Sequence, residues 1–537
     1  MLQQTWGKMW EWHDDIKSLF RLLAPSTGTG GGSSKATSST QPNPEPNKRK
    51  LSTRQLTGLW LGPVLFLAIL LFLRPEDLSP EAVGVLASTA WIATWWITEA
   101  IPIPATSLLP IVLFPLTGAM TDGVTSAYGD PNIFLFMGGF VIAIAMEKWN
   151  LHKRIALNII LVVGTSTSRL VLGFMVATGF LSLWISNTAT AMMMMPIALA
   201  VIAHVSSSLK VEGTQTNFGK ALMLAVAYSA SIGGLGTLIG TPPNAILAST
   251  VNELYGIEIS FATWMLFGVP IAVILLAFTW FYLVRVAFPL KIKELPGGKG
   301  VILDQRKQLG AMSYEEKWVM FVFVAAAFSW ITRSFFLNNF LPTLNDTIIA
   351  ITFAVLLFLL PSRAAADGRI VNWDDAKKLP WGILLLFGGG LAIAAGFRDT
   401  GLAVWIGDQL TGLAAVPFIF IIAAVTFLVL FLTEITSNTA TGTMMMPIMA
   451  SLALAIDVHP YTLMVAAGVA ASCAFMLPVA TPPNAIVFGS GYIEIQDMVK
   501  AGFWINIVSA LVITVMVYFL LGAVWGIDIS VFPEAFR

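Results

Sequence analysis

Residues 241–244 read Thr-Pro-Pro-Asn, and residues 481–484 repeat the same four letters. Both copies interrupt long apolar stretches, and each follows a Ser-Asn-Thr-Ala-Thr stretch, at residues 186–190 and 437–441. An unpaired backbone group is costly in hydrocarbon, so a broken helix is tolerated in a membrane only where it lines a buried site or a watery cavity. Two such breaks in matching halves of a chain are typical of carriers whose site lies near the bilayer midplane.

The composition indicates an all-α polytopic membrane protein. The 537 residues are 56% hydrophobic and 11% charged, whereas about a quarter of the residues of a soluble domain are charged. Many apolar runs reach the roughly 20 residues that a membrane-spanning helix needs. The net charge is zero, so we expect contact with membrane lipid and no nucleic-acid partner. The single cysteine, Cys473, excludes an intramolecular disulfide and a cysteine-rich metal site.

The N-terminal region has a different composition from the rest of the chain. Residues 24–50 are rich in Gly, Ser and Pro, which predicts a flexible cytoplasmic linker. Residues 1–23 combine aromatic and basic side chains, a pattern that fits an interfacial helix or a weakly ordered tail equally well. We therefore assign residues 1–56 to a cytoplasmic tail and linker.

Hydropathy predicts eleven membrane spans and two further apolar segments. The spans lie at about residues 57–73, 81–100, 104–119, 133–164, 219–251, 263–288, 316–336, 345–361, 381–411, 460–492 and 501–525. The further segments, about 169–208 and 416–456, carry the Ser-Asn-Thr stretches near their middles. Each is long enough to form a re-entrant hairpin, and each could equally form two full spans.

Loop charge predicts which side of the membrane each end occupies, because cytoplasmic loops carry an excess of Lys and Arg. Residues 48–54 and the loops at 289–315 and 362–380 are basic, so we place them in the cytoplasm. With eleven spans, the C-terminal end, which carries Asp528 and Glu534, falls outside the cell. We expect a multi-pass protein of the plasma membrane with a cytoplasmic N-terminus and an extracellular C-terminus.

The two halves of the chain form an internal repeat. Pairs of residues 251 positions apart match in the two halves: Gly138 with Gly389, Ser186 with Ser437, and Pro196 with Pro447. Five predicted spans separate the two Ser-Asn-Thr stretches. Because five is an odd number, the two halves must be inverted relative to each other in the membrane.

The motifs place neutral hydroxyl and amide groups at helix breaks. Their oxygen atoms, together with backbone carbonyls, suit a monovalent cation such as Na⁺, whereas their hydrogens and the free N–H groups of a helix start suit a carboxylate. The prolines free the carbonyls just before them, near Gly240 and Ala480. Neither motif contains Lys or Arg, so a bound anion would need cations and helix N-termini to balance its charge. We therefore expect anion affinity to rise with cation concentration.

Few other groups in the apolar segments could carry chemistry. Glu434, within the second motif, could form an ion pair, occupy a solvated position or attract a cation. The neighbours Glu147-Lys148 and Arg398-Asp399 occupy matching positions and predict structural pairs or helix interruptions. The sequence contains no arrangement typical of a nucleophilic or metal-dependent enzyme, so we expect no catalytic residue.

At these motifs the chain resembles the divalent anion/sodium symporter family, the INDY-type transporters of di- and tricarboxylates. The resemblance covers about residues 55–530. It implies secondary transport of C4-dicarboxylates such as succinate, malate and fumarate, or of citrate or 2-oxoglutarate, coupled to Na⁺ as the coupling ion. Two alternatives remain: dicarboxylate exchange that needs no Na⁺, and transport of sulfate or another inorganic divalent anion.

The resemblance also implies an architecture. It predicts a homodimer in which each protomer has eleven transmembrane helices and two re-entrant hairpins, with a transport domain that moves like an elevator against a scaffold. We assign residues 57–165 to the scaffold and the first half of repeat 1. The remaining ranges are the transport-domain part of repeat 1 at 166–290, a cytoplasmic loop and scaffold part of repeat 2 at 291–412, and the transport-domain part of repeat 2 at 413–530.

The family's site residues carry over position by position. The implied carboxylate contacts are Asn187, Thr188, Ser437, Asn438 and Thr439, to which we add Thr241 and Thr481 at the starts of the Thr-Pro-Pro-Asn copies. The first Na⁺ site would use Ser182, Ser186, Asn187 and the carbonyl of Gly240. The second would use Thr433, Thr436, Asn438 and the carbonyl of Ala480.

Overall fold

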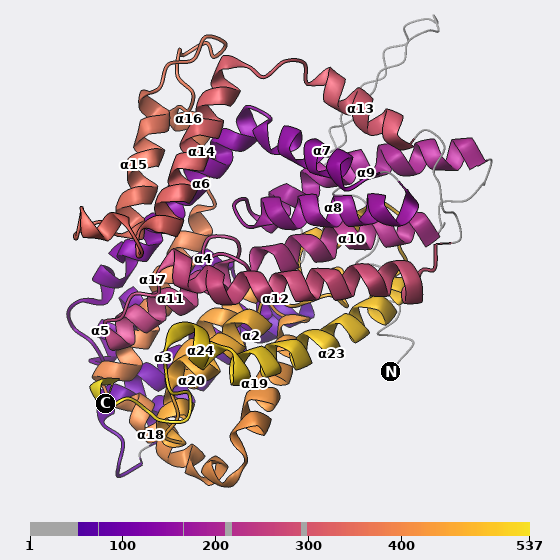
Figure 1. The fold of residues 1–537 in the computed structure, drawn as a ribbon. Helices are drawn as coiled ribbons and strands as arrows, with labels where there is room; N and C mark the ends of the chain where they lie inside the picture. Colours follow the sequence, from indigo (N-terminus) through magenta and orange to yellow (C-terminus); the bar gives the residue numbers. More distant parts are fainter. Residues whose placement is uncertain (1–51, 74, 165, 210–216, 291–297, 537) are drawn as a thin grey trace, which may run out of the picture.

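The computed structural model describes residues 52–73, 75–164, 166–209, 217–290 and 298–536, and these residues are almost entirely helical (Figure 1). The predicted tail falls outside the described residues up to position 51. Helix α2 begins at Thr53, four residues before the predicted start of the first span. Ser52 and Gln55 cap it reciprocally, which satisfies two N–H groups that the first turn leaves free.

The first half of the chain supplies helices up to residue 287. They are α2 Thr53–Phe72, α3 Pro80–Thr98, α4 Ile103–Thr106, α5 Leu109–Thr117, η1 Val124–Gly129, α6 Pro131–Lys148, α7 Leu151–Val163, α8 Thr167–Ser182, α9 Asn187–Leu209, α10 Asn217–Gly234, α11 Pro242–Tyr255, α12 Phe261–Tyr282 and the π-helical turn η2 Leu283–Ala287.

The second half repeats this order. Its helices are α13 Gly298–Gln308, α14 Tyr314–Thr332, η3 Leu337–Asn339, α15 Asp346–Leu359, α16 Trp373–Ala376, α17 Trp381–Asp399, α18 Leu402–Leu410, η4 Thr411–Ala415, α19 Phe418–Thr433, α20 Asn438–Ala455, α21 Pro460–Ala470, α22 Pro482–Gly489, α23 Ile495–Phe519, α24 Leu521–Trp525 and η5 Glu534–Phe536.

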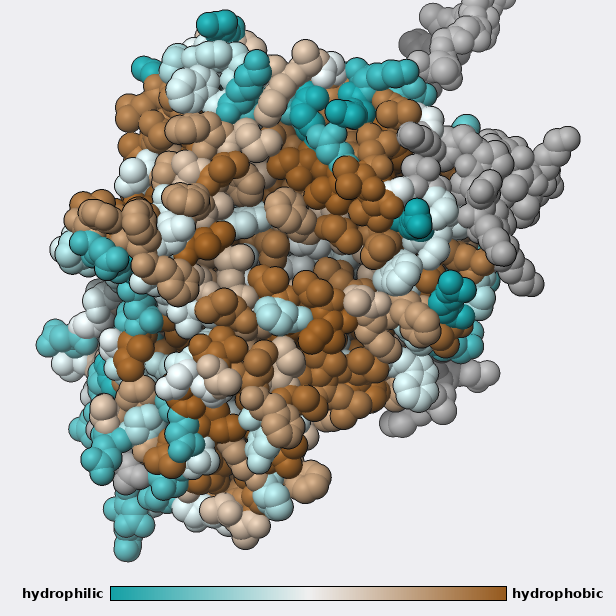
Figure 2. Space-filling view, in the orientation of Figure 1, coloured by the Kyte–Doolittle hydropathy of each residue, from teal (hydrophilic) through white to brown (hydrophobic). Residues whose placement is uncertain are grey.

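The outer surface suits a lipid environment. Within the described residues, six helices are long and apolar enough to cross a membrane, and five shorter helices are also apolar. Figure 2 shows a broad hydrophobic surface across the visible face, with hydrophilic side chains gathered toward the edges of the molecule. An apolar exterior of this extent is stable in hydrocarbon and would promote aggregation in water.

Two of the predicted spans are each divided into two helices at a left-handed residue. The segment 133–164 is divided into α6 and α7, and the segment 381–411 into α17 and α18. The residues at the divisions, Asn150 with φ of 58° and Gly401 with φ of 75°, adopt the left-handed conformation, which ends a right-handed helix. Since 401 follows 150 by 251 positions, the division belongs to the repeat.

Two helical hairpins carry the Ser-Asn-Thr stretches. The first hairpin is α8 and α9, and the second is α19 and α20; in each, the second helix begins at the Asn of the motif, Asn187 or Asn438. Helix α8 packs on α10, and α19 packs on α21. Helix α11 of the first half packs on α20, while α22 of the second half packs on α9. This reciprocal exchange surrounds one central region with both hairpins and both breaks.

The prolines of the repeated tetrapeptide begin helices. Helix α10 ends at Gly234 and α11 starts at Pro242, while α21 ends at Ala470 and α22 starts at Pro482. Proline suits the first helical positions because its fixed φ fits the helix and its missing N–H would have no partner there. The open backbone therefore lies upstream of the prolines, over the residues that include Gly240 and Ala480.

Candidate functional site

The asparagines of the repeated tetrapeptide hold the two breaks in shape. Asn244 Nδ2 donates to the carbonyl oxygens of Gly234 at 3.1 Å, Leu235 at 3.2 Å and Thr237 at 2.8 Å. Asn484 Nδ2 donates to the carbonyl oxygens of residues 474 and 477, both at 3.1 Å. Both side chains are fully buried. The sequence motif contained these residues, but its spacing gave no indication that the amides reach back ten residues.

Oxygen atoms converge where the first hairpin meets the first break. The Ser182 hydroxyl lies 2.5 Å from Asn187 Oδ1 and 2.7 Å from the carbonyl oxygen of Ala230. The same end of the Asn187 amide faces the carbonyl oxygens of Ala230 and Gly240, at 3.0 and 3.3 Å. Oxygens this close repel one another unless the amide turns its NH₂ group inward or a cation lies among them. Ser182, Asn187 and Gly240, three predicted ligands of the first Na⁺ site, thus lie together. The carbonyl oxygen of Ala230 joins them and was not predicted.

The fourth predicted ligand of this site, Ser186, lies in the turn of the hairpin. Its hydroxyl accepts from the backbone N–H of Ala189 at 3.3 Å and is half-buried. This bond caps the start of α9. The Ser186 hydroxyl makes no other hydrogen bond within the described residues, so it can also contact a ligand.

Two glycines permit the close approach at the first site. A Cβ atom on Gly234 would lie 2.7 Å from Asn187 Oδ1, and one on Gly240 would lie 2.5 Å from the Gly234 carbonyl oxygen. Neither distance is tolerated without a shift of the neighbouring atoms. The corresponding residues of the second half are Ala474 and Ala480. The two halves therefore have the same plan but different packing.

The second hairpin repeats the pairing of hydroxyl and amide. The Thr433 hydroxyl lies 2.7 Å from Asn438 Oδ1 and 3.0 Å from the carbonyl oxygen of Ala471. Thr433 is fully buried and Asn438 is half-buried. These positions match Ser182 and Asn187 of the first half, so the repeat extends to side-chain geometry.

The other two predicted ligands of the second site have different surroundings. The Thr436 hydroxyl lies 2.6 Å from Thr441 Oγ1 and 2.8 Å from the carbonyl oxygen of Leu432. Ala480 is buried in the break and its N–H donates to the carbonyl oxygen of Leu477 at 3.2 Å. Thr433 and Asn438 are therefore joined directly by a hydrogen bond, whereas Thr436 hydrogen-bonds within its own hairpin.

The predicted carboxylate contacts lie at the hairpin tips. Asn187 and Asn438 begin α9 and α20, whose N-termini carry a partial positive charge. Thr188, Ser437 and Thr439 are half-buried, and within the described residues their hydroxyls have no hydrogen-bond partner. Hydroxyls that are free to donate at a helix start form the kind of site that binds an anion.

Thr241 and Thr481, the remaining predicted contacts, are buried and already have partners. Thr241 Oγ1 lies 3.3 Å from Ser472 Oγ, which joins the first break to the second. Thr481 Oγ1 accepts from the backbone N–H of Asn484 at 3.3 Å and caps α22. Their hydroxyls connect the walls of the central region.

Glu434 has surroundings that the sequence did not suggest. Its carboxylate is buried and accepts from Asn506 Nδ2 at 2.7 Å and from the N–H groups of Phe475, Met476 and Leu477 at 2.7, 2.9 and 3.1 Å. No salt bridge to it occurs in the part of the chain that the structure describes, so the expected ion pair or solvated position is wrong. The carboxylate instead replaces the backbone partners that the second break lacks.

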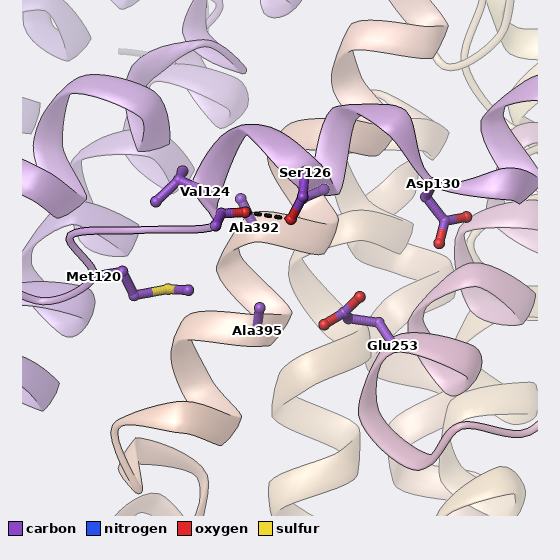
Figure 3. A pocket seen from close by; sticks show the side chains of 9 residues that line it. Met120, Val124, Ser126, Asp130, Glu253, Ala392 and Ala395 are labelled. Carbon is purple, nitrogen blue, oxygen red and sulfur yellow. Dashed lines mark hydrogen bonds between the residues drawn. The ribbon is translucent and has the colours of Figure 1, made fainter.

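Of the two charged neighbour pairs in matching positions, Arg398 and Asp399 bind each other, whereas Lys148 binds Asp375 and, within the described residues, Glu147 forms no salt bridge. Lys148 Nζ lies 2.7 Å from an Asp375 oxygen, and Arg398 pairs with Asp399 at 2.8 Å and Glu253 at 3.0 Å. Figure 3 shows Glu253 beside a small cavity between η1 and α17, and no residue of the two breaks lines this cavity.

The fold and the site define a class of protein: a helical membrane carrier with two oxygen-lined half-sites that repeat one plan. Residues 53–531 match the family described as the sodium:sulfate symporter transmembrane region. The chain belongs to this family of transporters, which confirms the resemblance seen in its motifs and the expectation that it is not an enzyme.

Relatives extend the likeness over nearly the whole chain. The sodium-dependent dicarboxylate transporter SdcS of Staphylococcus aureus strain MRSA252 is 54% identical over 490 residues, which cover 90% of this chain and 94% of the relative. The SdcS of Staphylococcus saprophyticus is 52% identical over the same shares.

Two solved structures share the fold. Neisseria gonorrhoeae MtrF has a TM-score of 0.51 and 11% identity, covering 86% of this chain and 95% of its own. Alcanivorax borkumensis YdaH has a TM-score of 0.54 and 12% identity, covering 82% and 99%. They support the helical membrane architecture alone.

Proposed function

We propose that the protein is a secondary transporter that couples uptake of a C4-dicarboxylate, such as succinate, malate or fumarate, to Na⁺. The observation that carries this proposal is the convergence of uncharged oxygens around Ser182 and Asn187, repeated in outline by Thr433 and Asn438. Relatives at 54% identity whose names specify a sodium-dependent dicarboxylate transporter support the choice of both solutes.

The chemistry of the half-sites favours a cation beside an anion. A cation bound by the Ser182 hydroxyl and the carbonyl oxygens of Ala230 and Gly240 would place positive charge behind the start of α9. The two carboxylates of the substrate could then accept hydrogen bonds from Thr188 at one tip and from Ser437 and Thr439 at the other. Because the motifs contain no Lys or Arg, the anion depends on the cations for charge balance. That dependence would couple the two solutes.

We further propose how the protein works as a whole. The hairpins and broken helices form a unit that moves across the membrane against the scaffold parts at residues 57–165 and 291–412, in a homodimer in the plasma membrane. The N-terminus lies in the cytoplasm and the C-terminus outside. The reciprocal packing of α11 on α20 and α22 on α9 supports a common rigid unit, because it ties the two half-sites together.

Uptake of labelled succinate into proteoliposomes tests the proposal. We expect uptake only with an inward Na⁺ gradient, with no requirement for internal succinate. Uptake that needs internal succinate and ignores Na⁺ would indicate exchange instead. The variants Asn187→Ala and Asn438→Ala should each abolish uptake while the oligomer stays intact by light scattering. Near-normal uptake by either variant would contradict the assigned site.

Sulfate is tested as a second substrate class in the same uptake assay, because the family's description names it. Sulfate is a smaller dianion with a single charged centre, whereas a C4-dicarboxylate has a carboxylate for each tip. We therefore expect unlabelled succinate to compete strongly with labelled succinate, and sulfate to compete weakly. Stronger competition by sulfate would assign the inorganic anion as substrate.

A further inference from the structure

A guanidinium from the first helix touches the tip of the second hairpin. Arg54 lies in the first turn of α2 and is half-buried. Its Nη2 donates to the carbonyl oxygen of Ile97, close to the end of α3, and to the carbonyl oxygen of Ile435 at 3.2 Å. Ile435 lies between α19 and α20, two residues before Ser437. One side chain thus connects two parts of the chain that are 381 residues apart.

Both acceptors are the kind of group that an arginine stabilises best. The last carbonyls of a helix have no partner within the helix and carry the negative end of its dipole. Ile97 is within the last turn of α3, and Ile435 follows the last residue of α19 by two positions. A planar guanidinium has several N–H donors and can serve two helix ends at once.

A second side chain supports the contact between α2 and α3, and helix α20 of the hairpin also packs on α3. The neighbour Gln55 donates to the carbonyl oxygen of Glu99 at 3.2 Å, and α2 packs along α3. The start of α2 is therefore held to α3 without help from Arg54. The side chain of Ile435 is 58% exposed, so little apolar packing holds the hairpin tip here. The bond from Arg54 is a specific attachment of that tip.

We propose that Arg54 is a positioning residue that fastens the second hairpin tip to the α2–α3 pair in one end state of the transport cycle. The inference rests on the proposed function, because it assumes that the hairpin unit moves against α2 and α3. When the hairpin moves away from α2 and α3, Arg54 keeps its hydrogen bond to the Ile97 carbonyl and loses its hydrogen bond to the Ile435 carbonyl. Arg54 thereby favours the end state described here and holds Ser437–Thr439 beside the ends of α2 and α3.

The proposal predicts a shift of population rather than a loss of the site. Hydrogen bonds from charged donors contribute on the order of 1.5–3 kcal/mol, and the lower value applies here because the contact is partly exposed. Removal of the bond should therefore change the ratio of the two end states by about 10-fold. Apparent substrate affinity should weaken on the membrane side that this state faces and strengthen on the other side, because apparent affinity follows the populated fraction.

Spin labels on the full-length protein test the idea. The labels replace Ile435, at the hairpin tip, and Leu71, which is 60% exposed at the far end of α2, as Ile435→Cys and Leu71→Cys. The native Cys473 is fully buried, and unmodified protein measures any background labelling. Pulsed electron–electron distance measurements in nanodiscs then report the two end states as two distances.

The variant Arg54→Gln should lower the population at the distance of this structure about 10-fold relative to the other, and Arg54→Lys should have a smaller effect. The matched control is Gln55→Ala, whose side chain contacts α3 and its own helix start, and it should leave the ratio unchanged. An unchanged ratio in Arg54→Gln, or an equal change in Gln55→Ala, overturns the proposal. Succinate uptake is measured separately. A protein that shows both label distances but takes up no succinate would refute the proposed function and leave the role of Arg54 in place.

Discussion

Gly240→Ala tests the first cation site with the smallest possible change. A methyl group at this position would lie 2.5 Å from the Gly234 carbonyl oxygen and 2.9 Å from the Ser182 carbonyl oxygen. Both neighbours are backbone atoms, so no side chain can rotate away to make room. Because the Gly240 carbonyl and the Ser182 hydroxyl are proposed cation ligands, any relief of the contact must move ligands apart.

The expected magnitude follows from the cost of overpacking. Extra methyl groups in a closely packed interior cost about 1–3 kcal/mol. If this cost falls on the cation-bound geometry, the Na⁺ concentration for half-maximal uptake should rise about 5- to 140-fold, since each 1.4 kcal/mol is about a factor of ten. Succinate affinity at saturating Na⁺ should change much less.

The assay is Na⁺ activation of succinate uptake in proteoliposomes, with choline replacing Na⁺ to hold ionic strength constant. Gly139→Ala is a matched control, because its methyl group would meet Ile239, the neighbour of Gly240, at an ordinary 3.4 Å. A Gly240→Ala protein that folds and keeps the wild-type Na⁺ dependence would refute the assignment of this carbonyl to a cation.

Three further outcomes test other parts of the site. Asn244→Ala and Asn484→Ala should each destabilise the protein by about 1–3 kcal/mol. The loss should be larger for Asn244, because its side-chain amide donates to three backbone carbonyls and that of Asn484 to two. Thermal unfolding in detergent measures both losses, and a larger loss for Asn484 would contradict the expectation. Glu434→Gln should lower both thermal stability and Na⁺ affinity, because the amide turns one acceptor toward the Leu477 N–H into a donor; a change in stability with normal Na⁺ activation would limit Glu434 to a structural role. Na⁺ should raise the unfolding temperature of the wild type more than choline at equal ionic strength, because a ligand that binds the folded state stabilises it, and equal effects would argue against a specific cation site.

The sequence predicted the architecture well because its strongest signals are long-range and periodic. Apolar runs gave the positions of most helices, and the repeat of Ser-Asn-Thr and Thr-Pro-Pro-Asn located both hairpins and both breaks. The divisions after residues 148 and 399 were missed, because a single left-handed residue such as Asn150 leaves the hydropathy of a long apolar run unchanged.

Side-chain partners within the site were harder to predict. The pairing of Ser182 with Asn187 lies within one turn and could be expected from the motif, whereas the Ala230 carbonyl comes from another helix. Glu434 was misjudged because its partners are backbone N–H groups 41 to 43 residues away. Sequence spacing shows where an acidic residue is, but not which backbone donors the fold leaves without partners.

The differences between the two halves bear on the order in which cations bind. The first half-site has Leu183 at the position of Glu434 and relies on neutral oxygens in close contact with two glycines. The second half-site has a buried carboxylate next to Thr433, and Asn506 and three backbone N–H groups donate to it. In its ionised form this carboxylate would attract a cation near Thr433, an attraction that a cation near Ser182 lacks. If both sites bind Na⁺, the second should fill at lower concentration, and the first should complete the charge balance that the dicarboxylate requires.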